Sequence, residues 1–111
     1  MKWFAVNCIF QIISGDGAHS PQFNEQTRLV LASDFSKALE KAKNRSKDYN
    51  STFNNFDGQQ VRWEFVGFGS IIEIEEPADG VEVSSLILEP HSVAFYLEKI
   101  AHRNKMLTQH N

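Results

Sequence analysis

The strongest constraint in this sequence is a long alternating run near its N-terminus, residues 2–14. Every second residue from Phe4 to Ile12 is apolar, whereas the positions between them mix apolar and polar side chains. Side chains of a strand point alternately to opposite faces, so this run predicts one long strand whose uniformly apolar face is buried. Such a strand needs neighbouring strands and a covering layer, which favours a fold built on a sheet.

The rest of the chain supplies three further predicted strands and two predicted helices. The strands are residues 22–32, 61–76 and 81–89, and the helices run from Ser33 to about Tyr49 and from Ser92 to about Met106. Asn50 to Gln60 is predicted as a loop because it is polar and rich in turn-forming residues. The order is therefore ββαββα.

This order predicts an α+β fold, a four-stranded antiparallel sheet with both helices on one face. We expect a single domain, residues 1–111, made of two strand–strand–helix halves at about 1–50 and 60–107. The apolar stripes of the two helices place Leu39 and Leu97 in one core between helices and sheet.

Glycines mark two special points of this predicted fold. Gly67 and Gly69 interrupt the third strand, and the apolar positions change parity beyond them, which predicts a bulge or bend. Pro77 to Gly80 is a turn signal, in which Gly80 is expected to take a positive φ.

Composition and charge exclude several classes of function. The net charge is −3, and the basic residues of the first helix are diluted by acidic ones, so nucleic-acid binding is not expected. Cys8 is the only cysteine and is expected to be buried and inert, without a disulfide or a thiolate metal site. We therefore predict no metal site.

Catalytic motifs are absent as well. The pair Gly67 and Gly69 lacks the third glycine and the following helix of a phosphate-binding loop. His19 shares a loop with Asp16 and Ser20, but a hydrolytic constellation there needs support from the tertiary structure. The sequence favours a non-enzymatic protein with no catalytic residues and no cofactor.

The N-terminal apolar run also bears on location. Asn7 and Gln11 interrupt it, and it is too short to span a bilayer, so we interpret it as a strand of the mature protein rather than as a signal peptide. The expected location is the cytoplasm, with no membrane partner.

Several stretches resemble a small bacterial family of uncharacterised domains. The most distinctive is residues 58–67, and the others are residues 2–6, 25–32, 38–42 and 79–85. The similarity extends to about residue 88 and leaves out the final helix. It implies a bacterial, cytoplasmic protein and carries no known activity or site residues.

The leading hypothesis for function is a protein-interaction or assembly module whose partner is another protein or a second copy of the chain. If the Phe4 face of the first strand meets the helices, no helix remains to cover the opposite face, and exposed apolar area usually marks an interface. The residues assigned to this predicted interface are Trp3, Asn7, Ile9, Gln11 and Val30.

The alternative hypothesis is a domain that binds a small ligand. An aromatic wall with a few polar groups is the usual composition of such a site, and Trp63 and Glu25 are predicted to line it near the glycine bend. Arg28 and Glu64 are the further candidate ligand-binding residues. A hydrolase centred on His19 is the third hypothesis.

Overall fold

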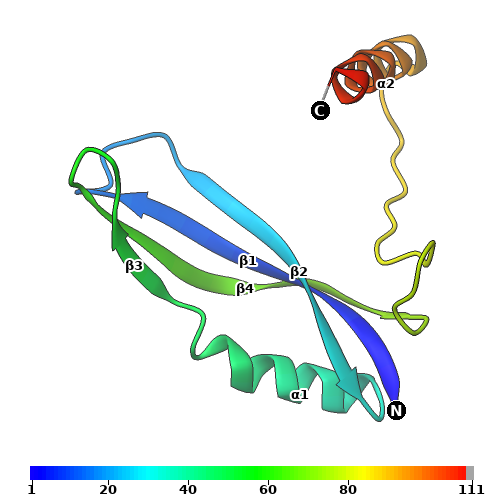
Figure 1. Cartoon of the computed structure of the whole chain (residues 1–111), viewed down its shortest axis with the longest axis horizontal. Helices are drawn as coiled ribbons and strands as arrows, with labels where there is room; N and C mark the ends of the chain where they lie inside the picture. The colour runs from blue at the N-terminus through cyan, green and yellow to red at the C-terminus, as the bar shows by residue number, and fades with distance from the viewer. Residues whose placement is uncertain (110–111) are drawn as a thin grey trace.

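The computed structural model, which describes residues 1–109, confirms the α+β fold and the order ββαββα (Figure 1). The strands are β1 (Lys2–Ser14), β2 (Gln22–Ala32), β3 (Ser51–Asn54) and β4 (Gln60–Ile74), and the helices are α1 (Phe35–Ser46) and α2 (Val93–Thr108). All strand pairs are antiparallel, and the strands lie in the order β2-β1-β4-β3. The long alternating strand is thus central, as its apolar character requires.

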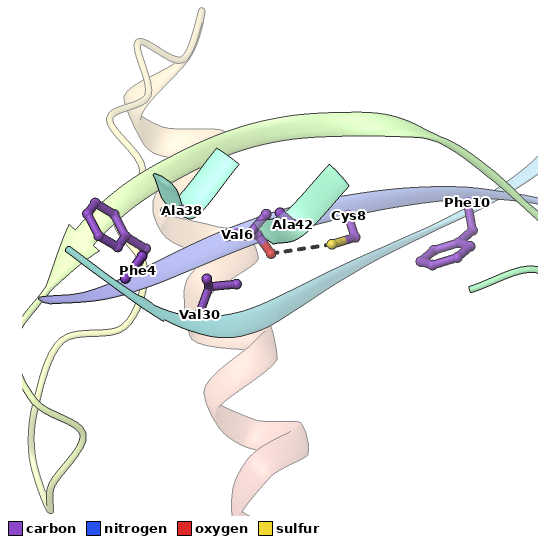
Figure 2. Packing of buried hydrophobic residues seen from close by; sticks show 8 residues of the cluster. Phe4, Val6, Cys8, Phe10, Val30, Ala38 and Ala42 are labelled. Carbon is purple, nitrogen blue, oxygen red and sulfur yellow. Dashed lines mark hydrogen bonds between the residues drawn. The ribbon is translucent and has the colours of Figure 1, made fainter. Parts of the chain in front are cut away.

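The core lies between α1 and the face of β1 that carries Phe4, Val6, Cys8 and Phe10, all of which are buried. Figure 2 shows these side chains with those of α1 and β2 in one cluster. The buried residues of α1 are Ala38 and Ala42, whose small side chains let the helix lie close to the strands. We call the side of the sheet on which α1 lies the helix face, and the other side the open face.

The register of β1 with β2 corrects one prediction about faces. Phe4 pairs with Val30 and Val6 with Arg28, so Val30 and Arg28 lie on the helix face, and Val30 is only 2% exposed. From the sequence, Val30 was expected on the face of the sheet that does not carry Phe4. A register shift of one residue inverts the faces of a whole strand, and the loop between the strands, which no apolar pattern specifies, sets that register.

The glycine pair of β4 produces the predicted irregularity. The pairing with β1 shifts between Asn7 and Cys8 and again between Ile9 and Phe10, which leaves Gly69 and Val66 without a partner. Ile72 and Ile74 then lie on the open face, opposite Ala5 and Trp3. A β-carbon on Gly69 would collide with the Asn7 side chain, so any larger residue at position 69 requires Asn7 to move.

One strand was missed in the sequence, and one predicted strand does not form. The predicted loop 50–60 contains β3, which forms a hairpin with β4 around a turn where Asn55 Oδ1 accepts hydrogen bonds from the backbone N–H groups of Asp57 and Gln59. The predicted strand 81–89 forms no ladder. Alternation favours extended backbone, but whether a neighbouring strand is present depends on the tertiary structure. Gly80 does take the predicted positive φ, 86°.

The placement of α2 was predicted wrongly. Its bounds agree with the predicted ones, and Ser92 caps it, since Ser92 Oγ accepts a hydrogen bond from the N–H of Phe95. Among the described residues, however, α2 contacts neither the sheet nor α1, and Figure 1 shows it at the end of an extended segment. Leu97 is 59% exposed and Leu39 is half-buried, so the two do not share a core.

Candidate functional site

The open face of the sheet is the first candidate site, because no helix covers it in residues 1–109. Register defines its members. The β1 positions Trp3, Ala5, Asn7, Ile9 and Gln11 are flanked by two rows from the neighbouring strands, which are Phe23, Glu25, Thr27, Leu29 and Leu31 of β2 and Glu64, Gly67, Ser70, Ile72 and Ile74 of β4. Apolar and polar groups alternate along it.

Four of the five predicted interface residues lie on this face: Trp3, Asn7, Ile9 and Gln11, all half-buried. The fifth, Val30, belongs to the core. The structure therefore brings four of the predicted residues together on one surface. Their role in an interface stays a prediction.

The predicted ligand-binding residues are divided between the two faces. Glu25 and Glu64 pair with Ile9 and Gln11 and lie on the open face. Trp63 pairs with Ile12 on the helix face, where its ring lies 6.3 Å from that of Phe10. Trp63 and Glu25 therefore cannot line one pocket.

Arg28 also lies on the helix face. Its guanidinium carbon lies 4.2 Å from the centre of the Tyr49 ring, a cation–π geometry, and its Nη2 donates to Gln26 Oε1 at 2.8 Å. Glu64 instead forms an ion pair with Arg62, in which Arg62 Nη1 lies 3.3 Å from Glu64 Oε1. Arg28 has a structural role against the end of α1, which the sequence did not indicate.

A cavity of about 410 Å³ lies over the middle of the open face, where residues Val83–Ser85 pass above it. We call this cavity the groove. Ala5 at its floor is only 2% exposed, although no helix lies on that side. Its polar lining comes from both the sheet and the crossing segment, namely Asn7, Glu25, Thr27, Ser70, Ser84 and Ser85.

A second cavity, about 470 Å³, lies at the end of the sheet next to the N-terminus. We call it the end hollow. Trp3, Leu31 and Ile74 line it, and register places these three in one row across β1, β2 and β4 on the open face. Glu73 and Glu76 are at its rim, where Glu73 pairs with Lys2 at 3.5 Å. The end hollow thus has apolar walls and a rim that carries Glu73, Glu76 and Lys2.

Cys8 is buried, as the sequence predicted. It is 1% exposed, and its thiol donates a long hydrogen bond of 3.8 Å to the carbonyl of Val6 (Figure 2). Burial raises the pKa of the thiol, against a smaller opposing effect of Arg28. Cys8 is therefore a neutral core residue rather than a nucleophile.

The His19 loop uses its polar groups to hold its own backbone. Nε2 of His19 accepts from the N–H of Ser14 at 3.0 Å, and Nδ1 lies 2.7 Å from the carbonyl of Ser20, to which it donates in the matching tautomer. Asp16 Oδ1 accepts from the N–H of Ala18. With both ring nitrogens engaged by backbone, His19 stabilises the β1–β2 connection and is not paired with a nucleophile.

Comparison with known families gives a match to a single family model, Domain of unknown function (DUF4288), over residues 3–85. The matched region is most of the chain and includes α1 and all four strands but for Lys2. The chain belongs to the DUF4288 family. This confirms the resemblance drawn from the sequence. Curated proteins and solved structures gave no match.

The DUF4288 match ends at Ser85, the last residue that lines the groove, so the groove lies within the matched region. The residues beyond it form what we call the arm, Leu86–Thr108, which consists of an extended stretch and α2. The DUF4288 region is therefore a sheet covered by one helix.

The arm was expected to belong to the core of this chain, but its apolar side chains are exposed. Eight of its large apolar side chains are more than half exposed, and Ile87 reaches 91%. The eight are Leu86, Ile87, Leu88, Val93, Phe95, Leu97, Met106 and Leu107. The stripe of α2 and the apolar triplet before it were visible in the sequence, but they were assigned to the core of this chain.

Across residues 1–109, no group of three His, Cys, Asp or Glu side chains is placed to hold a metal ion. Neither α1 nor α2 is long and apolar enough to cross a membrane.

Proposed function

We propose that this DUF4288 chain is a non-enzymatic protein-interaction module and that the arm is its contact element. The observation that carries the proposal is the exposure of the arm, which holds eight large apolar side chains more than half exposed and whose helix α2 contacts neither the sheet nor α1. Contiguous exposed apolar surface of this extent is typical of interaction sites in soluble proteins. We propose a cytoplasmic role because the chain resembles bacterial cytoplasmic domains.

Local stability supports the same proposal. A helix of about four turns is marginal in water on its own, and most helical stability in proteins comes from packing of an apolar face. Helix α2 has a side-chain cap, yet none of its residues is buried. A partner that covers its stripe would supply the missing packing.

The experiment is a comparison of native masses in extract from cells that carry the gene naturally. The wild type is expected to migrate well above the 12.7 kDa of one chain, whereas Leu97→Asp, which places a charge in the α2 stripe, is expected to migrate as the free chain. The control is His102→Asp, on the opposite side of the same helix. Migration of the wild type at 12.7 kDa would contradict the proposal.

The groove favours a second candidate function, binding of a small polar ligand. Its volume of about 410 Å³ falls in the range of roughly 300–1,000 Å³ for ligand sites, and Asn7, Glu25 and the hydroxyls of Ser84 and Ser85 supply hydrogen-bonding groups. Glu25 is the one residue of the predicted pocket that lines it.

Thermal-shift screening with small polar amines and amides tests this alternative. A true groove ligand should raise the melting temperature of the wild type but not that of Thr27→Leu, which fills the groove. Thr52→Leu, the same change at an exposed position of β3, should respond as the wild type does. Equal shifts in all three proteins would exclude the groove.

A further inference from the structure

We infer that two copies of this chain exchange their arms, so that α2 of each copy packs into the end hollow of the other. The inference rests on the proposed interaction function and names its partner, a second copy of the same chain. Three properties of the arm and the hollow support it: their apolar areas, their charges and the course of the chain between them.

Both the arm and the end hollow present apolar side chains. The α2 stripe includes Val93, Leu97 and Leu107, all mostly exposed, and the end hollow offers Trp3, Leu31 and Ile74 in one row. Six of the eight exposed side chains can face one partner, namely those of Leu86–Leu88 and of the stripe residues Val93, Leu97 and Leu107. Aromatic residues bury about 150–250 Å² each, and aliphatic ones somewhat less, so these six offer on the order of 700 Å² per arm. A stable interface needs roughly 800 Å² per partner, and a two-fold dimer contains two such contacts.

The charges are also complementary. Residues 73–82, of which Glu73 and Glu76 line the end hollow, contain no lysine or arginine and five carboxylates: Glu73, Glu75, Glu76, Asp79 and Glu82. These carboxylates outnumber Lys2, which also lines the end hollow. Helix α2 contains three basic residues, Lys99, Arg103 and Lys105, against the single acidic residue Glu98. A basic helix therefore suits the acidic segment 73–82 next to the end hollow, and acidic helices of other proteins would be disfavoured there.

The course of the chain directs α2 to another copy. Residues Val83–Ser85 stay on their own open face, and Leu86–Ser92 then runs outward without a ladder. Pro90 restricts Glu89 to extended conformations, which opposes a turn back to the same sheet. Seven extended residues span at most about 25 Å, which is long enough to hold α2 clear of its own sheet, as Figure 1 shows.

Exchange makes a distinctive prediction for mixed variants. Leu97→Asp damages the arm and leaves the hollow intact, whereas Trp3→Glu damages the hollow and leaves the arm intact. Each variant alone should be a monomer of 12.7 kDa by light scattering, because both contacts of its dimer are damaged. A mixture of the two should regain a species of twice that mass, because the intact arm of one meets the intact hollow of the other.

Matched controls keep the result interpretable. Phe23→Glu is a similar change at the far end of the open face and should remain dimeric, as should His102→Asp. If Trp3→Glu fails to fold, Leu31→Asp alters the same hollow. Circular dichroism should show native strand content in every variant that enters the mixture.

Each other result overturns the exchange. A Leu97→Asp protein that stays dimeric would show contact through the sheet alone, and a mixture that stays monomeric would show that arm and hollow do not meet. A purified wild type that is monomeric while the native extract holds a heavier species would contradict the exchange but not the interaction function. Monomers in both settings would contradict both.

Discussion

The two helices of this chain have similar sequences and different surroundings. Both have an apolar stripe and a side-chain cap, from Asp34 in α1 and from Ser92 in α2. Helix α1 lies on the sheet with Ala38 and Ala42 buried, whereas α2 has no buried residue. An amphipathic stripe thus indicates that a helix face will be covered, but it does not indicate by what.

The connections explain the difference. Only Ser33 and Asp34 separate β2 from α1, so the helix must return along its own sheet, where Lys41 Nζ also donates to the carbonyl of Leu31 at 2.8 Å. Residues 75–92 separate β4 from α2, and they contain two prolines. The long connection therefore allows α2 to lie away from the sheet, whereas the two-residue connection holds α1 against it.

The largest expected contrast comes from removing one phenyl ring in each region. Phe10→Ala should cost about 3–5 kcal/mol of unfolding free energy, because Phe10 is buried among Tyr49, Trp63 and Phe65. Phe95→Ala in α2 should change it by less than about 0.5 kcal/mol. Urea titrations of dilute protein, where dimerisation contributes least, measure both. Equal losses would mean that α2 is packed in the monomer.

The second contrast enlarges an alanine in each helix. Ala38→Leu should destabilise by about 1–3 kcal/mol, because Ala38 is fully buried against the sheet. Ala101→Leu lies on the exposed α2 and should be neutral within about 0.5 kcal/mol. The same titrations apply, and a tolerated leucine at position 38 would contradict the close approach of α1.

The smallest expected effect concerns the turn where the second connection begins. Gly80 has a φ of 86°, so Gly80→Ala should strain the turn by about 1 kcal/mol although no atom obstructs the new methyl group. Gly67→Ala, at an equally open position without a positive φ, is the control. Thermal melts compare them, and a Gly80 variant more stable than the wild type would contradict the turn.

The sequence predicted the parts of this structure that local pattern determines. The bounds of β1 and β2, the irregularity at Gly67 and Gly69 and the family were all recovered. The order ββαββα was also right, although its third and fourth strands are not the two that were predicted. Local chemistry decides each of these, such as alternation along β1 or the absence of a β-carbon at Gly69, where Asn7 approaches.

Three features depend on tertiary context and were missed. The loop before β2 sets its register and so placed Val30 in the core, and β3 lies in a polar segment without strand pattern. The arm was assigned to the core because its apolar residues suit a core and an interface equally well. As a result, the predicted pocket of Trp63 and Glu25 does not form, whereas four predicted interface residues share one face.

The mass of the purified wild type in solution tests the central claim that the arm is covered by a second copy of the chain. Light scattering over a series of micromolar concentrations is the measurement. We expect a species of twice 12.7 kDa that dissociates on dilution. A constant mass of 12.7 kDa across the series would contradict it.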